Sequence, residues 1–205
     1  MQALRREAGF SLTELLVVVL LLGIAAGIAV PMADTTARGF RIKGDAQAIA
    51  NMVALSKMRA ASRYSRTRIH ADLDTNTFQL EVWVPTALAN KEVGSWVIDG
   101  GTVRLSRGVT FGFAARPAPP TNTQTVIGQS AECTATDSLD DDPQADTACI
   151  VFNSRGIPID TDGEPTGGNA LYITDGSAVY ATTVTATPLV RQWWSGSESG
   201  GWIQQ

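Results

Sequence analysis

The chain has 205 residues, 44% of them hydrophobic and 18% charged, and its net charge at pH 7 is −4. This composition is typical of a folding domain and excludes an intrinsically disordered chain. The negative net charge gives no general attraction to nucleic acid or anionic lipid, so binding of either would need a local basic patch.

The first predicted element is an apolar helix near the N-terminus. Uncharged, mostly apolar residues run from Leu15 to Ala33, close to the ~20 residues that span a hydrocarbon core. Arg5 and Arg6 precede this run, which predicts that the rest of the chain is exported. A cleaved secretory signal and a plain single-span anchor are two alternatives. Neither explains Glu14, because an acid within a span costs about 2.5–3.5 kcal/mol on insertion scales.

An amphipathic helix is predicted next, over residues 34–66. Asp34 follows Pro31 and offers N-cap chemistry, so we expect a break near 31–36 and a new helical start. Apolar residues then recur at helical spacing, which predicts a helix lying on a sheet. These apolar positions are Ile42, Ala46, Ile49, Val53 and Ala60.

After this helix the apolar residues alternate, as in strands. We expect strands at 67–73 and 78–84, a hairpin of 95–98 with 102–105, a continuation at 109–113, a hairpin of 170–174 with 177–185, and a last strand at 189–194. One helix followed only by strands predicts an α+β fold with an antiparallel β head over 67–194. The Ser- and Gly-rich residues 195–205 are expected to form a flexible tail.

An irregular loop over residues 115–149 is predicted to interrupt the head. Cys133 and Cys149 lie within it, and in an exported head a single disulfide between them is expected. Their spacing fits no zinc pattern, since His70 is the only histidine, so no metal site is expected. The enclosed acids lack the order of a known calcium loop and are expected to be solvated. They are Asp137, Asp140, Asp141, Asp142 and Asp146.

A basic stretch runs against the acidic background. No acid interrupts it, and its cations are Lys57, Arg59, Arg63, Arg66 and Arg68. Arg59, Arg63 and Arg66 would share one helical face, which can follow a phosphate backbone. Alternatively, these are cations at a helix C-terminus, favoured there by the helix dipole or paired with a neighbour. No catalytic motif accompanies them, so we expect neither an enzyme nor a cofactor.

The stretch from Gly9 to Val18, GFSLTELLVV, resembles the class III signal of type IV pilins and pseudopilins. The resemblance implies a pilin fold, in which a long N-terminal helix packs on an antiparallel sheet. It implies a leader over residues 1–9, cut after Gly9 by a prepilin peptidase, and methylation of Phe10. Residues 10–33 would be an inner-membrane helix with the head in the periplasm, and later the core of a pilus or pseudopilus. There Glu14 would meet the Phe10 amine of a neighbouring pilin, a buried pairing that fixes register.

A second, shorter stretch narrows the resemblance. Residues 152–158, FNSRGIP, followed by the hairpin at 170–185, resemble the GspH/FimT-type minor pilins. This implies a subunit of a type IV pilus or type II secretion system that takes part in filament assembly or initiation. The alternative is a DNA-binding competence pilin acting in DNA uptake. DNA-binding members carry Gly-Arg-x-Arg near the C-terminus, whereas residues 187–194 have only Arg191 and no such glycine.

Overall fold

The computed structural model describes residues 11–85, 94–135, 143–196 and 201–205, without the side chains of residues 28–35. The chain divides into two compact units, residues 1–40 and residues 41–205. Helix α1 (Leu12–Arg63) contributes to both units. The break expected near 31–36 is absent, since the helix continues through Pro31. A proline in a helix removes one backbone hydrogen bond, but good helix formers on both sides carry the helix past it.

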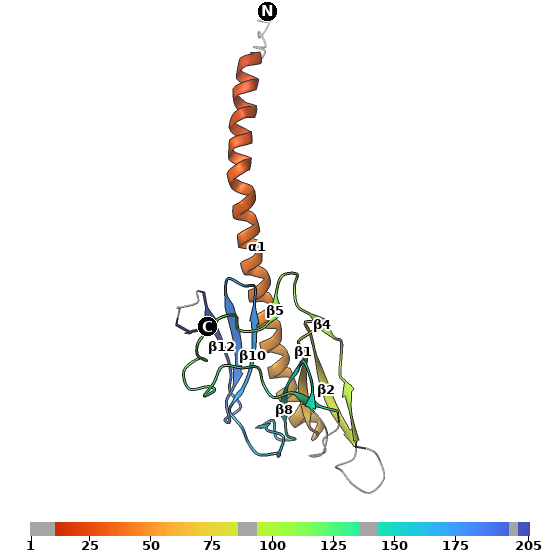
Figure 1. The fold of residues 1–205 in the computed structure, drawn as a ribbon. Helices are drawn as coiled ribbons and strands as arrows, with labels where there is room; N and C mark the ends of the chain where they lie inside the picture. The colour runs from red at the N-terminus through yellow and green to blue at the C-terminus, as the bar shows by residue number, and fades with distance from the viewer. Residues whose placement is uncertain (1–10, 86–93, 136–142, 197–200) are drawn as a thin grey trace, which may run out of the picture. The chain divides into compact units, whose positions relative to one another are not determined.

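The second unit is a head of antiparallel strands around the C-terminal part of α1 (Figure 1). One sheet has the order β3-β2-β1-β8-β9, with β4 also paired to β2, and we call it sheet A. Sheet B has the order β13-β12-β11-β10-β5, and β6 pairs only with β7. The strands are β1 (Thr67–Asp72), β2 (Thr77–Pro85), β3 (Gly94–Ile98), β4 (Val103–Arg104), β5 (Thr110–Phe111), β6 (Cys133–Thr134), β7 (Pro143–Gln144), β8 (Thr147–Phe152), β9 (Pro158–Ile159), β10 (Asn169–Thr174), β11 (Val179–Val184), β12 (Val190–Ser195) and β13 (Ile203–Gln204).

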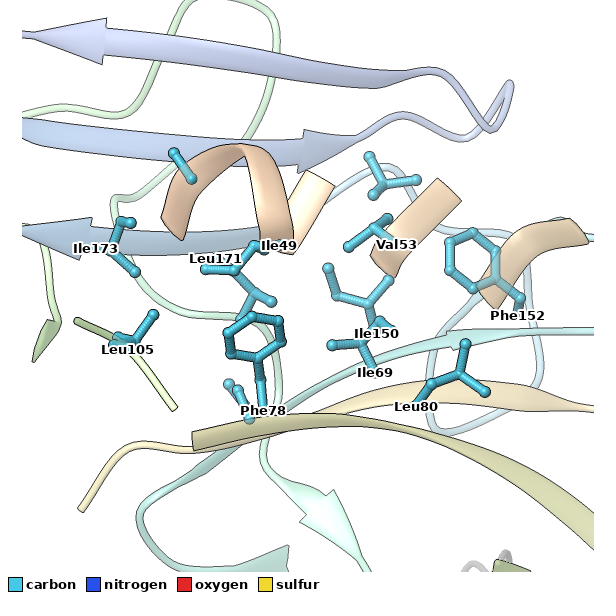
Figure 2. Packing of buried hydrophobic residues seen from close by; sticks show 14 of the residues in the cluster. Ile49, Val53, Ile69, Phe78, Leu80, Leu105, Ile150, Phe152, Leu171 and Ile173 are labelled. Carbon is cyan, nitrogen blue, oxygen red and sulfur yellow. The ribbon is translucent and has the colours of Figure 1, made fainter. Parts of the chain in front are cut away.

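The core forms where α1 meets both sheets. All five apolar positions predicted for the amphipathic helix are buried. Figure 2 shows Ile49 and Val53 of the helix among Ile69 and Ile150 of sheet A and Leu171 of sheet B. Burying such side chains is the main favourable term in folding, at roughly 25 cal/mol per Å² of apolar surface. The α+β class, with a helix packed on antiparallel sheet, is confirmed.

Two predicted strand pairings are wrong. The residues expected to form a hairpin, 95–98 with 102–105, do not pair with each other. Both segments pair with β2 instead, through Ile98 opposite Glu81 and Val103 opposite Phe78. Residues 99–102 therefore interrupt an edge strand, and Gly100 with φ 112° supplies a backbone conformation that favours glycine. The segment expected to continue this meander, 109–113, contributes β5 to sheet B instead.

The hairpin predicted around Asp175-Gly176 is confirmed as β10 and β11. Oδ1 of Asp175 accepts hydrogen bonds from the backbone N–H groups of Ser177 and Ala178, each at 2.9 Å. Gly176 has φ 87°, as such a turn requires. The last predicted strand is also present, as β12. The segment predicted as a flexible tail contains the buried Ser195 and the short strand β13, paired with β12.

The expected disulfide joins Cys133 to Cys149, with the two Cα atoms 5.0 Å apart. Between them, Asp137, Asp140, Asp141 and Asp142 lie outside the described residues, so the expectation of a solvated acidic loop is untested there. Asp146 is exposed, and its φ of 56° is that of a turn residue. The segment ending in Cys133 and Thr134 is held to sheet A by the disulfide and by a hydrogen bond from Cys149 N–H to the Ala131 carbonyl, at 2.8 Å.

Candidate functional site

The N-terminal segment offers an apolar surface. Gly9 and Phe10 lie outside the described residues. The large apolar side chains from Leu12 to Leu22, together with Ile24, are between 50% and 79% exposed. A continuous apolar surface of this kind marks contact with lipid or with another protein. Within the described residues, no helix combines the length and the hydropathy needed to cross a membrane.

Glu14 is the acidic residue in the first turn of α1. A carboxylate there is stabilised by the positive end of the helix dipole. The turn is closed by the Leu15 N–H, which donates to the Ser11 carbonyl at 3.1 Å. Glu14 is exposed and is surrounded in sequence by exposed apolar side chains. A partner with positive charge would therefore have direct access to it.

Two of the arginines predicted as a nucleic-acid stripe bind an aspartate of the head. Arg59 Nε lies 3.3 Å from Asp99 Oδ2, and Arg63 Nη2 lies 3.1 Å from Asp99 Oδ1. The side chain of Asp99 is 20% exposed and the two arginine side chains are 43% and 45% exposed. Asp99 therefore ties the end of α1 to the interruption between β3 and β4.

The other cations do not extend this face. Helix α1 ends at Arg63, so the prediction that Arg66 shares a helical face with Arg59 and Arg63 is wrong. The chain leaves the helix because Tyr64 adopts φ 51°. Arg66 lies over the ring of Trp83, 5.6 Å from its centroid. Lys57 Nζ donates to the Pro188 carbonyl at 3.0 Å.

Arg68 is buried on the outer side of sheet A. Its Nε lies 2.6 Å from Glu81 Oε2, its Nη1 donates to the Thr134 carbonyl at 2.7 Å, and its guanidinium lies 4.3 Å from the ring centroid of Trp96. Burial lowers the pKa of Arg68, and the charge of Glu81 opposes this effect. With 5% of its side chain exposed, Arg68 is a structural residue and no surface for a phosphate backbone.

Glu81 joins Arg68 to His70. His70 Nδ1 lies 3.4 Å from Glu81 Oε1 but is not aligned for a hydrogen bond. Gln79 donates to the same oxygen at 2.6 Å. Burial opposes ionisation of Glu81, but His70, Arg68 and Gln79 outweigh it and lower its pKa to about 2. Sequence reasoning missed this cluster, although polar residues at alternate positions of two strands predicted to be neighbours were a signal.

Two hollows lie near these residues. One, of about 580 Å³, is lined by Arg63, Tyr64, Arg66, Trp83 and Ser154 among others, and none of the described residues that line it is acidic. The second, of about 480 Å³, lies over the outer side of sheet A and we call it the disulfide cleft. Its walls include Arg68, Trp96, Cys133, Cys149 and Asn169, and the acids that line it, within the described part of the chain, are Glu132, Asp160 and Asp162.

Comparison with known proteins identifies the N-terminal segment. Residues 4–30 match the family described as the prokaryotic N-terminal methylation motif. This match covers 27 of the 205 residues and supports the resemblance of the N-terminal segment to type IV pilins and pseudopilins.

Among solved structures, the chain is similar to the minor pseudopilin EpsH from the type 2 secretion system of Vibrio cholerae. The identity is 13%, the TM-score is 0.41, and the alignment covers 78% of this chain and 99% of that one. A similarity at this level carries no argument about function. No curated protein matches the sequence.

Proposed function

We propose that this chain is a minor pilin or pseudopilin, a structural subunit that takes part in the assembly or initiation of a type IV pilus or a type II secretion pseudopilus. It is made as a single-pass inner-membrane precursor with its head in the periplasm. A prepilin peptidase cuts after Gly9, Phe10 is methylated, and the helix then joins those of other pilins. The match of residues 4–30 to the methylation motif carries this proposal.

The helix supports an assembly role in two ways. Its first part presents exposed apolar side chains from Leu12 to Ile24, which suit a bilayer before assembly and neighbouring helices afterwards. Its last part is the central element of the head core, through Ile42, Ile49 and Val53. The same helix therefore supplies both the apolar N-terminal segment and the central element of the head core.

Glu14 is the residue that we assign to assembly. Cleavage after Gly9 creates a new amine four residues upstream of this carboxylate. A carboxylate among apolar helices is tolerated when it meets an opposite charge, and such a pair fixes register between subunits. Glu14 of one subunit would therefore pair with the Phe10 amine of its neighbour, which couples processing to polymerisation.

The processing step is tested by expressing the full chain with and without a prepilin peptidase and determining the mature N-terminus by mass spectrometry. We expect an N-methylated Phe10 only when the peptidase is present. Cleavage near Ala25–Ala29 by another peptidase, or an intact precursor, would contradict the proposal. Glu14→Gln should leave cleavage intact and abolish incorporation into filaments, whereas Thr13→Ala, its neighbour on the same turn, should affect neither.

DNA binding is the second candidate function, and the hollow lined by Arg63, Tyr64 and Arg66 favours it. Two guanidinium groups and an aromatic ring, with no acid among the lining residues that the structure describes, suit a phosphate backbone and stacked bases. Retention of DNA by the full chain in detergent should fall for Arg63→Ala and Arg66→Ala together. It should rise for Asp99→Asn, because Arg59 and Arg63 lose their carboxylate partner. If the retention of DNA is the same for the unaltered chain, for Arg63→Ala with Arg66→Ala, and for Asp99→Asn, this site is excluded.

A further inference from the structure

The histidine of β1 lies beside the disulfide of the head. In the antiparallel register of β1 with β8, His70 stands opposite Cys149. One ring nitrogen of His70 and the Sγ atoms of Cys133 and Cys149 lie within 4.8 Å of one another. Thiolate sulfur and imidazole nitrogen are ligands that Zn²⁺ prefers. We propose that the head, when this disulfide is reduced, binds one Zn²⁺ ion through Cys133, Cys149 and His70.

The spacing suits a tetrahedral site. With Zn–S bonds of about 2.3 Å and Zn–N bonds of about 2.0–2.1 Å, tetrahedral ligand atoms lie about 3.4–3.8 Å apart. The two sulfurs must separate once their bond is broken, and the three ligand atoms start within 4.8 Å of one another. Cys149 is fixed in the six-residue strand β8, whereas Cys133 lies in the two-residue strand β6. Cys133 is therefore the ligand that adjusts.

The surroundings of His70 already resemble the second shell of a metal site. Ligating histidines usually face a carboxylate, which fixes the orientation of the ring. Here Glu81 Oε1 lies 3.4 Å from His70 Nδ1, and Glu81 is itself held by Arg68 and Gln79 at 2.6 Å each. The side chains of His70 and Glu81 are 17% and 7% exposed. The carboxylate thus lies beside the ring, and metal binding would require the ring to turn into line with it.

The disulfide cleft gives a metal ion a route to the two cysteine ligands. Cys133 and Cys149 both form part of its wall, and its volume of about 480 Å³ leaves room for a water molecule as fourth ligand. Glu132, Asp160 and Asp162 also line it. These three carboxylates outnumber the one cation among the described wall residues, Arg68, which is itself paired with Glu81, and an excess of acidic groups raises the local concentration of divalent cations.

The metal-bound and disulfide forms exclude each other. A thiol or phosphine reductant supplies two electrons, and with two protons the S–S bond becomes two thiols. Binding of Zn²⁺ then releases both thiol protons, because the thiolate is the ligand. In an exported chain the metal would bind before a disulfide oxidant removes two electrons and two protons from the thiols. The sequence predicted no metal site because the spacing of its cysteines and histidine along the chain fits no zinc motif. In the structure, the pairing of β1 with β8 and the disulfide bring the three residues together.

The test uses the full chain in detergent micelles, with its disulfide reduced by a phosphine in anaerobic buffer, and Co²⁺ as a visible probe for Zn²⁺. We expect a thiolate-to-cobalt charge-transfer band that saturates at one Co²⁺ per chain and disappears when Zn²⁺ is added. The oxidised chain should give no band. His70→Gln should weaken Co²⁺ binding at least tenfold and Glu81→Gln by about 10–100-fold. Cys149→Ser should abolish saturable binding, and Arg155→Gln, in an exposed turn, should change nothing.

Near-ultraviolet circular dichroism, which reports the packed Trp83–Trp96 pair, shows whether the reduced head is folded. Absence of a saturable band, equal binding by the oxidised chain, or unweakened binding by the His70→Gln variant would each overturn the proposal. A reduced chain that unfolds and is not refolded by Zn²⁺ would overturn it as well. None of these results bears on cleavage after Gly9, so the assembly function is judged separately.

Discussion

Arg68 of β1 and Glu81 of β2 form an ion pair across sheet A, with Nε 2.6 Å from Oε2 and side chains 5% and 7% exposed. Trp96 covers the guanidinium, and the Thr134 carbonyl accepts one of its hydrogen bonds. The pair thus connects the sheet to the segment that the disulfide holds. A buried pair is costly to break because one uncompensated charge remains.

Removing one partner of this pair should destabilise the head strongly. We expect Glu81→Gln to lower the free energy of unfolding by about 3–5 kcal/mol, since Arg68 keeps its charge in a buried place. Arg68→Met combined with Glu81→Leu should cost much less, because no charge remains. Denaturant unfolding of the full chain in micelles, followed by tryptophan fluorescence, measures both. If the double variant is as unstable as the single one, the hydrogen bond from Arg68 to the Thr134 carbonyl contributes more to stability than the balance of charge does.

The same carboxylate predicts a pH dependence. The pKa of Glu81 falls from 4.5 to about 2 on folding, so its ionised form stabilises the head. This stabilisation, on the order of 3 kcal/mol, is present above the pKa of the unfolded chain and is lost as the pH falls toward 2. The free energy of unfolding, measured from pH 6 to pH 2, should decrease more steeply for the unaltered chain than for Glu81→Gln. Parallel curves would assign the acid sensitivity to other carboxylates.

Any side chain at Gly156, in the turn after β8, is predicted to destabilise the head. Its φ is 73°, and a Cβ there would lie 3.1 Å from both the carbonyl oxygen and the Cγ of Lys57 in α1. Gly156→Ala should cost about 2–3 kcal/mol of stability, from strain at positive φ plus crowding against the helix. Gly163 is a matched control, with φ 83° and no atom within 4 Å of the place that a Cβ would occupy. Gly163→Ala should cost only about 1 kcal/mol, and equal losses would remove the helix contact from the explanation.

The disulfide should contribute substantially to stability. Its cysteines are 16 residues apart in the sequence, and closing a loop of this size is worth about 3 kcal/mol in the loop-entropy model. We expect Cys133→Ser with Cys149→Ser to lower the free energy of unfolding by about that amount. The unaltered chain with and without a phosphine reductant gives an independent measurement. A loss well above the expected value would show that the segment around Ala131 to Thr134 also leaves sheet A.

The two arginines on Asp99 should matter little for stability. Both are more than two-fifths exposed, so water and salt screen the pairs. Asp99→Asn should lower the free energy of unfolding by less than about 1 kcal/mol, and the difference should shrink further at high salt. Comparing the variant with the unaltered chain at about 0.05 M and about 1 M salt checks this, since these concentrations bracket weak and strong screening. If the loss of stability in Asp99→Asn grows with salt, the backbone conformation of residues 99–102 contributes to stability and the charge of Asp99 does not.

The sequence by itself determined the parts of this protein that depend on local patterns. The motif at residues 9–18 predicted the match to the N-terminal methylation motif, and helical spacing from Ile42 to Ala60 predicted which side of α1 is buried. The turn at Asp175-Gly176 predicted the β10–β11 hairpin, because short-range hydrogen bonds and a positive φ specify it. Each signal lies within a few residues of the structure that it specifies.

Only the tertiary structure decided which distant residues meet. Asp99-Gly100-Gly101 has the composition of a hairpin turn, yet β3 and β4 both pair with β2. Which strands become neighbours in a sheet depends on how the whole core packs, and not on the turn alone. In the sequence, Arg68 cannot be distinguished from the other cations of the basic stretch. In the structure it is buried against Glu81 and Trp96. His70 and Cys149 are far apart in sequence, and the register of β1 with β8 makes them opposite residues. Pairing between strands is a long-range outcome of burying apolar surface, so local spacing does not encode it.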